Sequence, residues 1–291
     1  MNKYYLLVFS LFHLFRVSAQ EDLLSLLEEE ETINYTSAIF KTSRIINSHS
    51  IENTPRGILD VKISHRFGFV NNGIYDLFGL DGATIRIGGD FGITDNLSLG
   101  FGRSSLEKMY DVYAKMRILR QSNGKRIMPV SLSYLATASI NTLRFEDPDA
   151  SNLFQSRLYY GHQILIARKF SEGFSLQLMP TLVHRNLVQT HAESHDVFSI
   201  GIGGRQKISK RVSINLEYFY NLPDQLAQQY RNSLSIGFDI ETGGHVFQLH
   251  FTNSTSMVYK GFITETVGDW TDGGIHFGFN LSRVFSLKGN K

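Results

Sequence analysis

The chain has 291 residues, a formal net charge of +2, 22 Phe and 13 Tyr against one Trp, and no Cys. The lack of cysteine excludes disulfides, thiolate metal sites, cysteine nucleophiles and a lipid anchor on cysteine, and the small net charge gives no indication of a nucleic-acid partner. Beyond residue 19 no apolar run approaches the ~18 residues of a transmembrane helix, so this chain can cross a membrane only with strands.

The first nineteen residues have the pattern of a secretory signal peptide. Lys3 supplies the positive charge, residues 6–15 are an apolar run, and Val17 to Ala19 place small residues where a signal peptidase cleaves. A run of this length is too short to span a bilayer. We therefore expect residues 1–19 to be removed on export.

Residues 20–56 are predicted to be an N-terminal extension. Leucines and a block of carboxylates over residues 21–31 favour a short amphipathic helix, and residues 38–47 are less periodic. The extension could rest at the periplasmic side, enter a barrel as a plug, or add a strand over residues 38–48. We favour the periplasmic or plug interpretation, because a thirteenth strand would break the even number usual in bacterial barrels.

From residue 58 onward apolar residues recur at every second position, the period of a strand with one apolar and one polar face. Residues 57–287 contain twelve such segments and residues 288–291 form a tail; fourteen strands is the alternative count. The twelve segments are 59–67, 84–93, 97–102, 111–118, 130–141, 157–169, 174–185, 198–205, 212–220, 234–241, 247–252 and 275–282.

The connections between these segments alternate between long and short, with ambiguity only at 103–108 and 121–127. This alternation is typical of an up-and-down barrel with short periplasmic turns, whereas a Greek-key sandwich scatters its long connections. The sequence therefore predicts an all-β, transmembrane, antiparallel barrel of about twelve strands in the outer membrane of a Gram-negative bacterium. An even strand count places both termini in the periplasm.

Residues 58–121 resemble an uncharacterised outer-membrane β-barrel family, a domain of unknown function, of Bacteroidota. The resemblance rests on LDVKISHRFG at 59–68, FGLDGATIRIG at 78–88, FGITDNLSLGFGRSS at 91–105 and LRQ at 119–121. It extends more weakly to the C-terminus. The family implies the fold and the location and brings no established activity.

Two glycine-rich motifs, Gly100 to Ser105 and Gly201 to Lys207, are superficially similar to phosphate-binding loops. Such loops join a strand to a helix whose N-terminus holds the anion. Both motifs lie inside alternating segments with no helix after them. We interpret Gly88, Gly92, Gly100 and Gly102, in and before the first motif, as barrel wall that leaves space for long neighbours such as Arg86 or Lys115. We expect no cofactor.

Histidines give only weak candidates for chemistry. His191 and His195, with His184 nearby, could bind a metal only if their loop formed a helical turn. Solvated loop histidines are commoner, so no metal site is expected. No hydrolase triad can be assembled; His65 beside Ser64 is the nearest candidate and is better explained as a membrane-interface residue. The protein is expected not to be an enzyme.

The polar faces of the strands give the predicted lining of the lumen, with nine positive and six negative groups and two histidines. These residues are Asp60, Lys62, Arg66, Arg86, Asp90, Asp111, Lys115, Arg117, Arg157, Lys169, Arg185, Arg205, Glu217, Asp239, Glu241, His250 and His276. They could fill the interior with ion pairs or create a field across a narrow pore.

Three functions follow from this lining. The first is a monomeric narrow channel or transporter for small polar or anionic solutes, with access set by loops 143–154 and 253–273. The second is a non-conducting barrel that binds a periplasmic or surface partner through its N-terminal segment or loops. The third is a barrel enzyme. Beyond such a protein partner, the expected contacts are outer-membrane lipid and small solutes.

Overall fold

The computed structural model describes residues 32–145, 153–191, 193–242 and 245–287. The predicted signal peptide, the helix at 21–31 and the tail at 288–291 lie outside these residues. Among the described residues no helix is long and apolar enough to cross a membrane.

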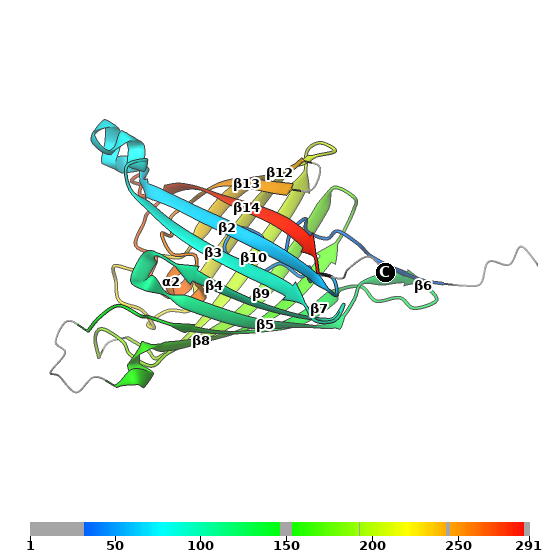
Figure 1. The fold of residues 1–291 in the computed structure, drawn as a ribbon, viewed down its shortest axis with the longest axis horizontal. Helices are drawn as coiled ribbons and strands as arrows, with labels where there is room; N and C mark the ends of the chain where they lie inside the picture. The colour runs from blue at the N-terminus through cyan, green and yellow to red at the C-terminus, as the bar shows by residue number, and fades with distance from the viewer. Residues whose placement is uncertain (1–31, 146–152, 192, 243–244, 288–291) are drawn as a thin grey trace, which may run out of the picture.

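Twelve antiparallel strands form one closed barrel, in which the last strand pairs with the first (Figure 1). This confirms the predicted fold and strand count. The strands are β2 Ile58–Phe69, β3 Ala83–Gly92, β4 Leu97–Ser104, β5 Tyr110–Leu119, β7 Ser131–Ile140, β8 Leu158–Lys169, β9 Phe174–Arg185, β10 Asp196–Lys207, β11 Val212–Asn221, β12 Leu234–Thr242, β13 His245–Thr252 and β14 His276–Ser286.

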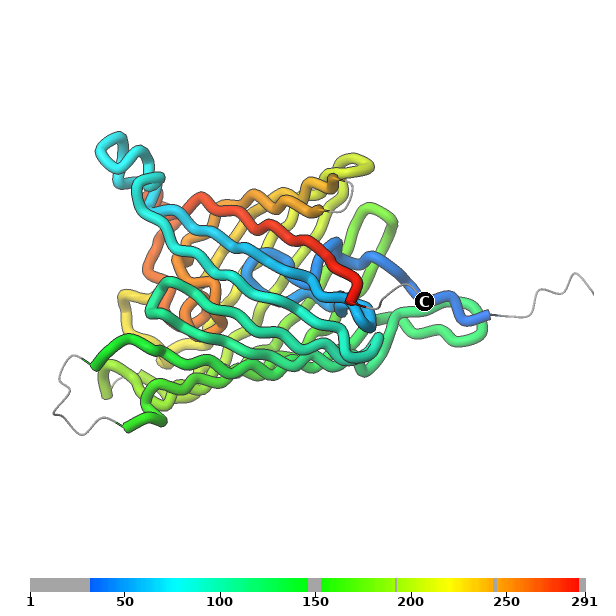
Figure 2. The backbone as a smooth tube through the Cα atoms, viewed as in Figure 1, coloured from blue at the N-terminus to red at the C-terminus, as the bar shows by residue number. Residues whose placement is uncertain are grey.

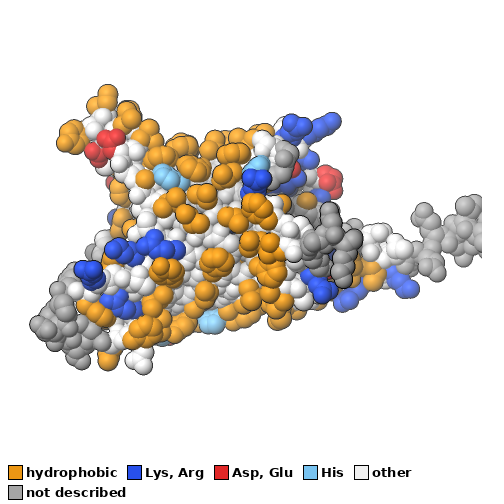
Figure 3. All heavy atoms as spheres, in the orientation of Figure 1, with side chains coloured by type: hydrophobic (Ala, Val, Ile, Leu, Met, Phe, Trp, Pro, Cys, Tyr) orange, Lys and Arg blue, Asp and Glu red, His pale blue; other side chains and the backbone are white. Residues whose placement is uncertain are grey.

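The alternating sequence explains the two faces of the wall. Along β5, for example, Val112 and Met116 are exposed outward while Lys115 is buried inward. Hydrophobic side chains cover much of the outer wall in Figure 3. Because lipid offers no hydrogen-bond partners, closure of the sheet is what satisfies every strand edge.

The barrel has two unlike ends, which we call the turn end and the loop end. The turn end holds the short connections at 93–96, 170–173 and 208–211. The loop end holds the longer connections, with the short helices η1 Val70–Gly79, η2 Leu106–Lys108, η3 Phe154–Arg157 and α2 Tyr259–Thr264. The ambiguous connections are now placed: 105–109 lies at the loop end and 120–130 at the turn end.

A small sheet of β1 Ile33–Tyr35 and β6 Ser122–Gly124 projects beyond the turn end (Figure 1). The sequence did not predict it, because three-residue strands carry too little periodicity to be recognised. Residues 38–48 form no barrel strand, so the alternative of an additional strand there is wrong.

Glycine makes room for one long side chain in the wall. A Cβ built on Gly102 would lie 2.1 Å from the Arg86 guanidinium, and one on Gly88 would lie 2.9 Å from it. The interpretation of these glycines as space for Arg86 is confirmed. Both glycine-rich motifs lie within strands, Gly100 to Ser104 in β4 and Gly201 to Lys207 in β10.

Candidate functional site in the lumen

Residues 36–56, the inner segment, run inside the barrel as a hairpin whose two ends lie at the turn end (Figure 2). Within it the Ser50 amide donates to the Ser43 carbonyl at 3.0 Å, and the Ile45 amide donates to the Ser48 carbonyl at 2.9 Å. The segment leaves the barrel beside Gly92, where a Cβ would lie 2.0 Å from the Pro55 carbonyl oxygen. Only glycine at position 92 allows this close approach.

A single carboxylate holds the tip of the hairpin. Glu217 on β11 accepts hydrogen bonds from the amides of Ile46, Asn47 and Ser48 at 3.0–3.2 Å, and from the Ser48 hydroxyl at 2.7 Å. Glu217 is only 1% exposed. Because a buried charge without partners is costly, these donors are what allow a carboxylate to lie here.

Other polar side chains of the wall contact the backbone of the inner segment. Gln177 donates to the His49 carbonyl at 2.8 Å, Asn280 donates to the Ile46 carbonyl at 3.0 Å, and Lys115 donates to the Ser50 carbonyl at 3.0 Å. Apolar side chains of the inner segment also pack against the wall and against α2, in one buried cluster. The inner-segment members of this cluster are Ile39, Phe40, Ile45, Ile46 and Ile51. The seam between segment and wall therefore combines hydrogen bonds from polar wall side chains with a buried apolar cluster.

The connection 253–275 fills the lumen from the loop end. Its short helix α2 is entirely buried and places Phe262 against Phe219 of β11, with ring centroids 5.4 Å apart. Lys260 forms ion pairs with Glu107 at 3.0 Å and with Glu265 at 2.6 Å. Burial by itself would lower the pKa of Lys260, but these two carboxylates outweigh it and raise the pKa above the usual range.

The two fillings meet at His49 and Tyr259. The His49 amide donates to the Tyr259 hydroxyl at 3.0 Å, and that hydroxyl donates to Gln163 of β8 at 2.9 Å. Because the Tyr259 hydroxyl has one proton and donates it to Gln163, it can only accept from the His49 ring. The Nδ1 nitrogen of His49 is therefore the donor in this contact. Burial lowers the pKa of His49 well below its usual range, and the charges of Arg44 and Lys115 add to this.

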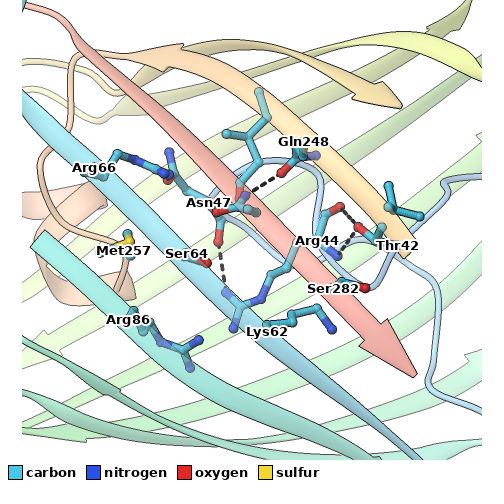
Figure 4. Close-up of a pocket in the computed structure, with 13 residues that line it drawn as sticks. Thr42, Arg44, Asn47, Lys62, Ser64, Arg66, Arg86, Gln248, Met257 and Ser282 are labelled. Carbon is cyan, nitrogen blue, oxygen red and sulfur yellow. Dashed lines mark hydrogen bonds between the residues drawn. The ribbon is translucent and has the colours of Figure 1, made fainter. Parts of the chain in front are cut away.

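A cavity of about 20 Å³ lies between the inner segment and the wall of β2, β3, β13 and β14 (Figure 4). It offers room for about one water molecule. Arg44, Lys62, Arg66 and Arg86 line it, and no carboxylate does. The cavity is therefore electropositive as well as polar.

The cations of the cavity differ in how they are neutralised. Lys62 pairs with Asp60 and Asp90, and Arg86 pairs with Asp111. Among the described residues Arg66 has no carboxylate within ion-pair distance; it donates to the carbonyls of His65 and of the Asn47 side chain, and its Nε has no partner. Arg44 likewise donates only to the Asn47 backbone carbonyl, at 2.9 Å. Among the described residues, Arg44 and Arg66 therefore have no ion-pair partner.

Most of the residues expected in the lumen are buried on the inner side of the wall. These buried residues are Asp60, Lys62, Arg66, Arg86, Asp90, Lys115, Arg185, Arg205, Glu217, Asp239, His250 and His276. Within the described part of the chain His250 has no hydrogen-bond partner for either ring nitrogen, whereas the ring of His276 contacts Thr255 and the Phe67 carbonyl at 2.9 Å.

The remaining expected residues lie at the barrel ends and are half-buried. Arg157 belongs to η3 at the loop end, where its guanidinium lies 3.6 Å from the Phe145 ring centroid. At the turn end, Lys169 pairs with Glu172, and Glu241 pairs with Lys41 of the inner segment. Asp111 is held by Arg86 and Arg117 donates to the Asp95 carbonyl, so charges inside this barrel are mostly engaged.

The weak candidates for chemistry are not assembled into a site. Within the described ranges, no three residues among His, Cys, Asp and Glu are grouped as metal ligands. His195 contacts the Arg185 carbonyl through Nδ1 at 2.6 Å, and His191 is exposed. His65 stacks on Phe279 on the outer wall, with centroids 5.0 Å apart.

Sequence reasoning missed the residues that close the lumen. Arg44, Asn47 and His49 lie in the weakly periodic extension, and Tyr259 lies in a long loop. One signal was available: the loop at 253–275 carries Met257, Val258, Phe262 and Ile263, more apolar side chains than a solvated loop needs.

Comparison with known families gives the family directly. Residues 40–285 match the family described as membrane-bound β-barrel domain, DUF5777. The chain belongs to this family. It is therefore a membrane-bound barrel, and closed antiparallel barrels of this kind are the outer-membrane type. The matched region includes most of the inner segment as well as the wall.

Solved structures include barrels of similar outline, and no curated protein sequence matches the chain. The NanC porin is 9% identical, covering 79% of this chain and 100% of its own, with a TM-score of 0.49. The KdgM porin is 9% identical over 78% and 99%, with a score of 0.48. The COG4313 outer membrane channel from Pseudomonas putida F1 is 16% identical over 81% and 98%, with a score of 0.47. These identities are too low to transfer a function.

Proposed function

We propose that the protein is a gated outer-membrane channel for small polar or anionic solutes, with the lumen closed in this structure by the inner segment and connection 253–275. The observation that carries the proposal is the nature of the seam. Beside the apolar cluster, polar and charged side chains of the wall hold the tip and backbone of the inner segment through hydrogen bonds, as at Glu217 and Gln177. A wall built only for stability would be apolar, because replacing buried ionic groups by well-packed apolar residues is often neutral or stabilising.

The inner segment is suited to leave the lumen as a unit. Its ends lie together at the turn end, so withdrawal breaks none of the ladders between barrel strands. Each hydrogen bond lost contributes only about 1 kcal/mol net, because water replaces the partner. Charged wall groups exposed by withdrawal would be hydrated, and they would then line an aqueous pore.

The preference for anions rests on the unpaired positive charge of the electropositive cavity. Among the described residues the Arg44 and Arg66 guanidinium groups donate only to carbonyl oxygens, and the Arg66 Nε has no partner. A small anion entering the lumen would find these guanidinium groups at the level of the hairpin tip. Rings of basic side chains are the usual selectivity element of anion pores.

The orientation follows the usual rule for such barrels. We place the turn end and both termini in the periplasm and the loop end outside, because bacterial barrels have short periplasmic turns. Residues 1–19 act as the signal peptide, residues 20–56 form an extension that includes the plug, and residues 57–287 form the barrel. The source would be a member of the Bacteroidota.

Deleting residues 20–50 tests the proposal. In planar bilayers the deletion variant should open more often than the full chain, because connection 253–275 alone then closes the lumen. A conductance ratio that favours chloride over potassium would support the anion preference. A deletion variant that folds and inserts but never conducts would sink the channel hypothesis.

A docking barrel is the second candidate, favoured by the β1–β6 sheet beyond the turn end. In that case the same deletion would leave the lumen non-conducting and abolish binding of a periplasmic protein. We propose no enzymatic role, since the best candidate pair, Ser64 and His65, places the His65 ring against Phe279 on the outer wall.

A further inference from the structure

The connection between β2 and β3 forms an exposed apolar knob, defined as residues 70–80, at the loop end. Ile74 is 82% exposed and Tyr75 is 91% exposed, and Leu77, Phe78 and Leu80 are exposed as well. The knob is visible at the upper left of Figure 3 as hydrophobic side chains that continue the hydrophobic covering of the barrel wall. Its single charged residue, Asp76, is half-buried.

The knob is a built unit that holds this shape. The Asn72 side chain donates to the Asp76 carboxylate at 2.7 Å, and the Val70 amide donates to the Ile275 carbonyl at 2.8 Å. Leu77 and Phe78 hold positive φ angles of 46° and 55°, which L side chains rarely adopt. Both side chains are nevertheless left exposed, so intramolecular burial does not explain why the strained turn is kept.

Lipid is the occupant that fits this surface. The knob joins β2 to β3, and the outward side chains Ile85 and Ile87 of β3 belong to the lipid-facing wall. It is rich in aliphatic and aromatic residues, and Tyr and Phe are typical of barrel girdles at the membrane interface. Exposed apolar patches on proteins mark a contact surface. Here the patch is continuous with the barrel wall that contacts lipid.

We propose that the apolar knob rests in the lipid of the outer leaflet and anchors the loop end of the barrel to the membrane surface. The aromatic and aliphatic tips enter the boundary between headgroups and acyl chains, while the base stays bonded to Ile275, the residue before β14. This role is independent of whether the lumen conducts.

Quenching by brominated lipid tests the proposal. Tyr75→Trp is placed in a Trp270→Phe background, so that one tryptophan reports on the knob in phosphatidylcholine vesicles brominated either near the headgroup or deep in the acyl chain. Phe101→Trp on the outer wall is the membrane control, and Ile127→Trp, 77% exposed on the connection that projects beyond the turn end, is the water control.

The expected result is at least a twofold loss of Tyr75→Trp fluorescence with bromine near the headgroup, and a smaller loss with deep bromine. Phe101→Trp should be quenched by deep bromine and Ile127→Trp by neither. If Tyr75→Trp behaves like Ile127→Trp while Phe101→Trp is quenched, the knob lies in water and the proposal is overturned. Quenching of Phe101→Trp also confirms that the barrel has folded and inserted.

Discussion

The hydroxyl of Tyr259 lies 3.0 Å from the Nδ1 nitrogen of His49, and this contact joins the two segments that fill the barrel from opposite ends. His49 comes from the turn end and Tyr259 from the loop end. The rings are stacked with centroids 5.7 Å apart. The two segments that close the lumen are thus joined by a contact that breaks when either segment moves.

Removing the hydroxyl should loosen the closure. Tyr259→Phe deletes the contacts with His49 and Gln163, and at about 1 kcal/mol for each hydrogen bond the ratio of open to closed time should rise at least fivefold. Single-channel recording measures this ratio. Tyr134→Phe, which loses a 2.6 Å contact with His162 on the outer wall, is the matched control. Equal open times for the two variants would argue against the contact as part of a gate.

Neutralising Glu217 should release the hairpin tip. Hydrogen bonds to a charged group contribute about 1.5–3 kcal/mol, so Glu217→Gln should expose the inner segment at least tenfold more often. Because the chain has no cysteine, Ile51→Cys gives one reporter whose labelling rate by a water-soluble maleimide measures that exposure. Glu172→Gln, at an exposed turn residue, should leave the rate unchanged. A rate unaffected by Glu217→Gln would mean that the carboxylate does not hold the segment.

Acidification should open the lumen through His49, which belongs to the inner segment rather than to a spanning strand. Its pKa is lowered in the closed state by burial and by nearby cations, so the released state binds the proton more tightly. The closed state is therefore fully stable above the ordinary value of about 6.5 and loses up to about 1.4 kcal/mol for each pH unit below it. The charged and aromatic groups around the ring are Arg44, Arg86, Asp90, Tyr113, Lys115 and Tyr259.

Open time measured between pH 7 and pH 5.5 checks this expectation, and it should rise about tenfold for each pH unit once below the ordinary pKa. His49→Gln should flatten the dependence, whereas His162→Gln on the outer wall should preserve it. If His49→Gln retains the full pH dependence, another group is responsible.

A larger residue at position 92, where the inner segment leaves the barrel, should also weaken the packing of the inner segment against the wall. In Gly92→Ala the new Cβ would meet the Thr54 and Pro55 carbonyl oxygens at 2.4 and 2.0 Å, and such overpacking costs about 1–3 kcal/mol. Hydrogen exchange of residues 43–57 should accelerate accordingly. Gly204→Ala is the control, because its Cβ would meet only the Leu176 side chain, at 3.3 Å. Equal exchange rates in the two variants would show that the glycine at position 92 is not needed to hold residues 54–56 in place.

The wall was predictable from the sequence because its information is local. Alternation at every second residue, as in Leu59 to Phe67, reports which face of a strand meets lipid, and the lengths of the connections report how strands are joined. The alternation and the connection lengths can both be read from neighbouring residues, without knowledge of any contact between distant parts of the chain. The twelve strands and the inward side of the charged residues follow from them.

The sequence favoured a periplasmic or plug position for the extension, but the contacts that close the lumen were not predictable, because they join residues far apart in the chain. The Ser48 hydroxyl meets Glu217 across 169 positions, and the Gln248 side chain meets the Ile45 carbonyl across 203. No local pattern in residues 36–56 specifies which wall residue will accept or donate. The ion-paired interior, one of the two expectations for the lining, is also incomplete, because among the described residues Arg66 donates to two carbonyl oxygens and pairs with no carboxylate.

A reversible staple between the inner segment and the wall tests the central claim most directly. Asn47 and Ser235 lie with side-chain atoms 2.9 Å apart, so Asn47→Cys and Ser235→Cys are combined as the staple, and loss of free thiol on oxidation shows that the disulfide has formed. Single-channel current is recorded from one preparation, first oxidised and then reduced. The gated-channel account predicts silence while the disulfide holds and openings after reduction. Equal conductance in the oxidised and reduced states would contradict the account. Silence in both states would also contradict it if the variant lacking residues 20–50 is silent as well.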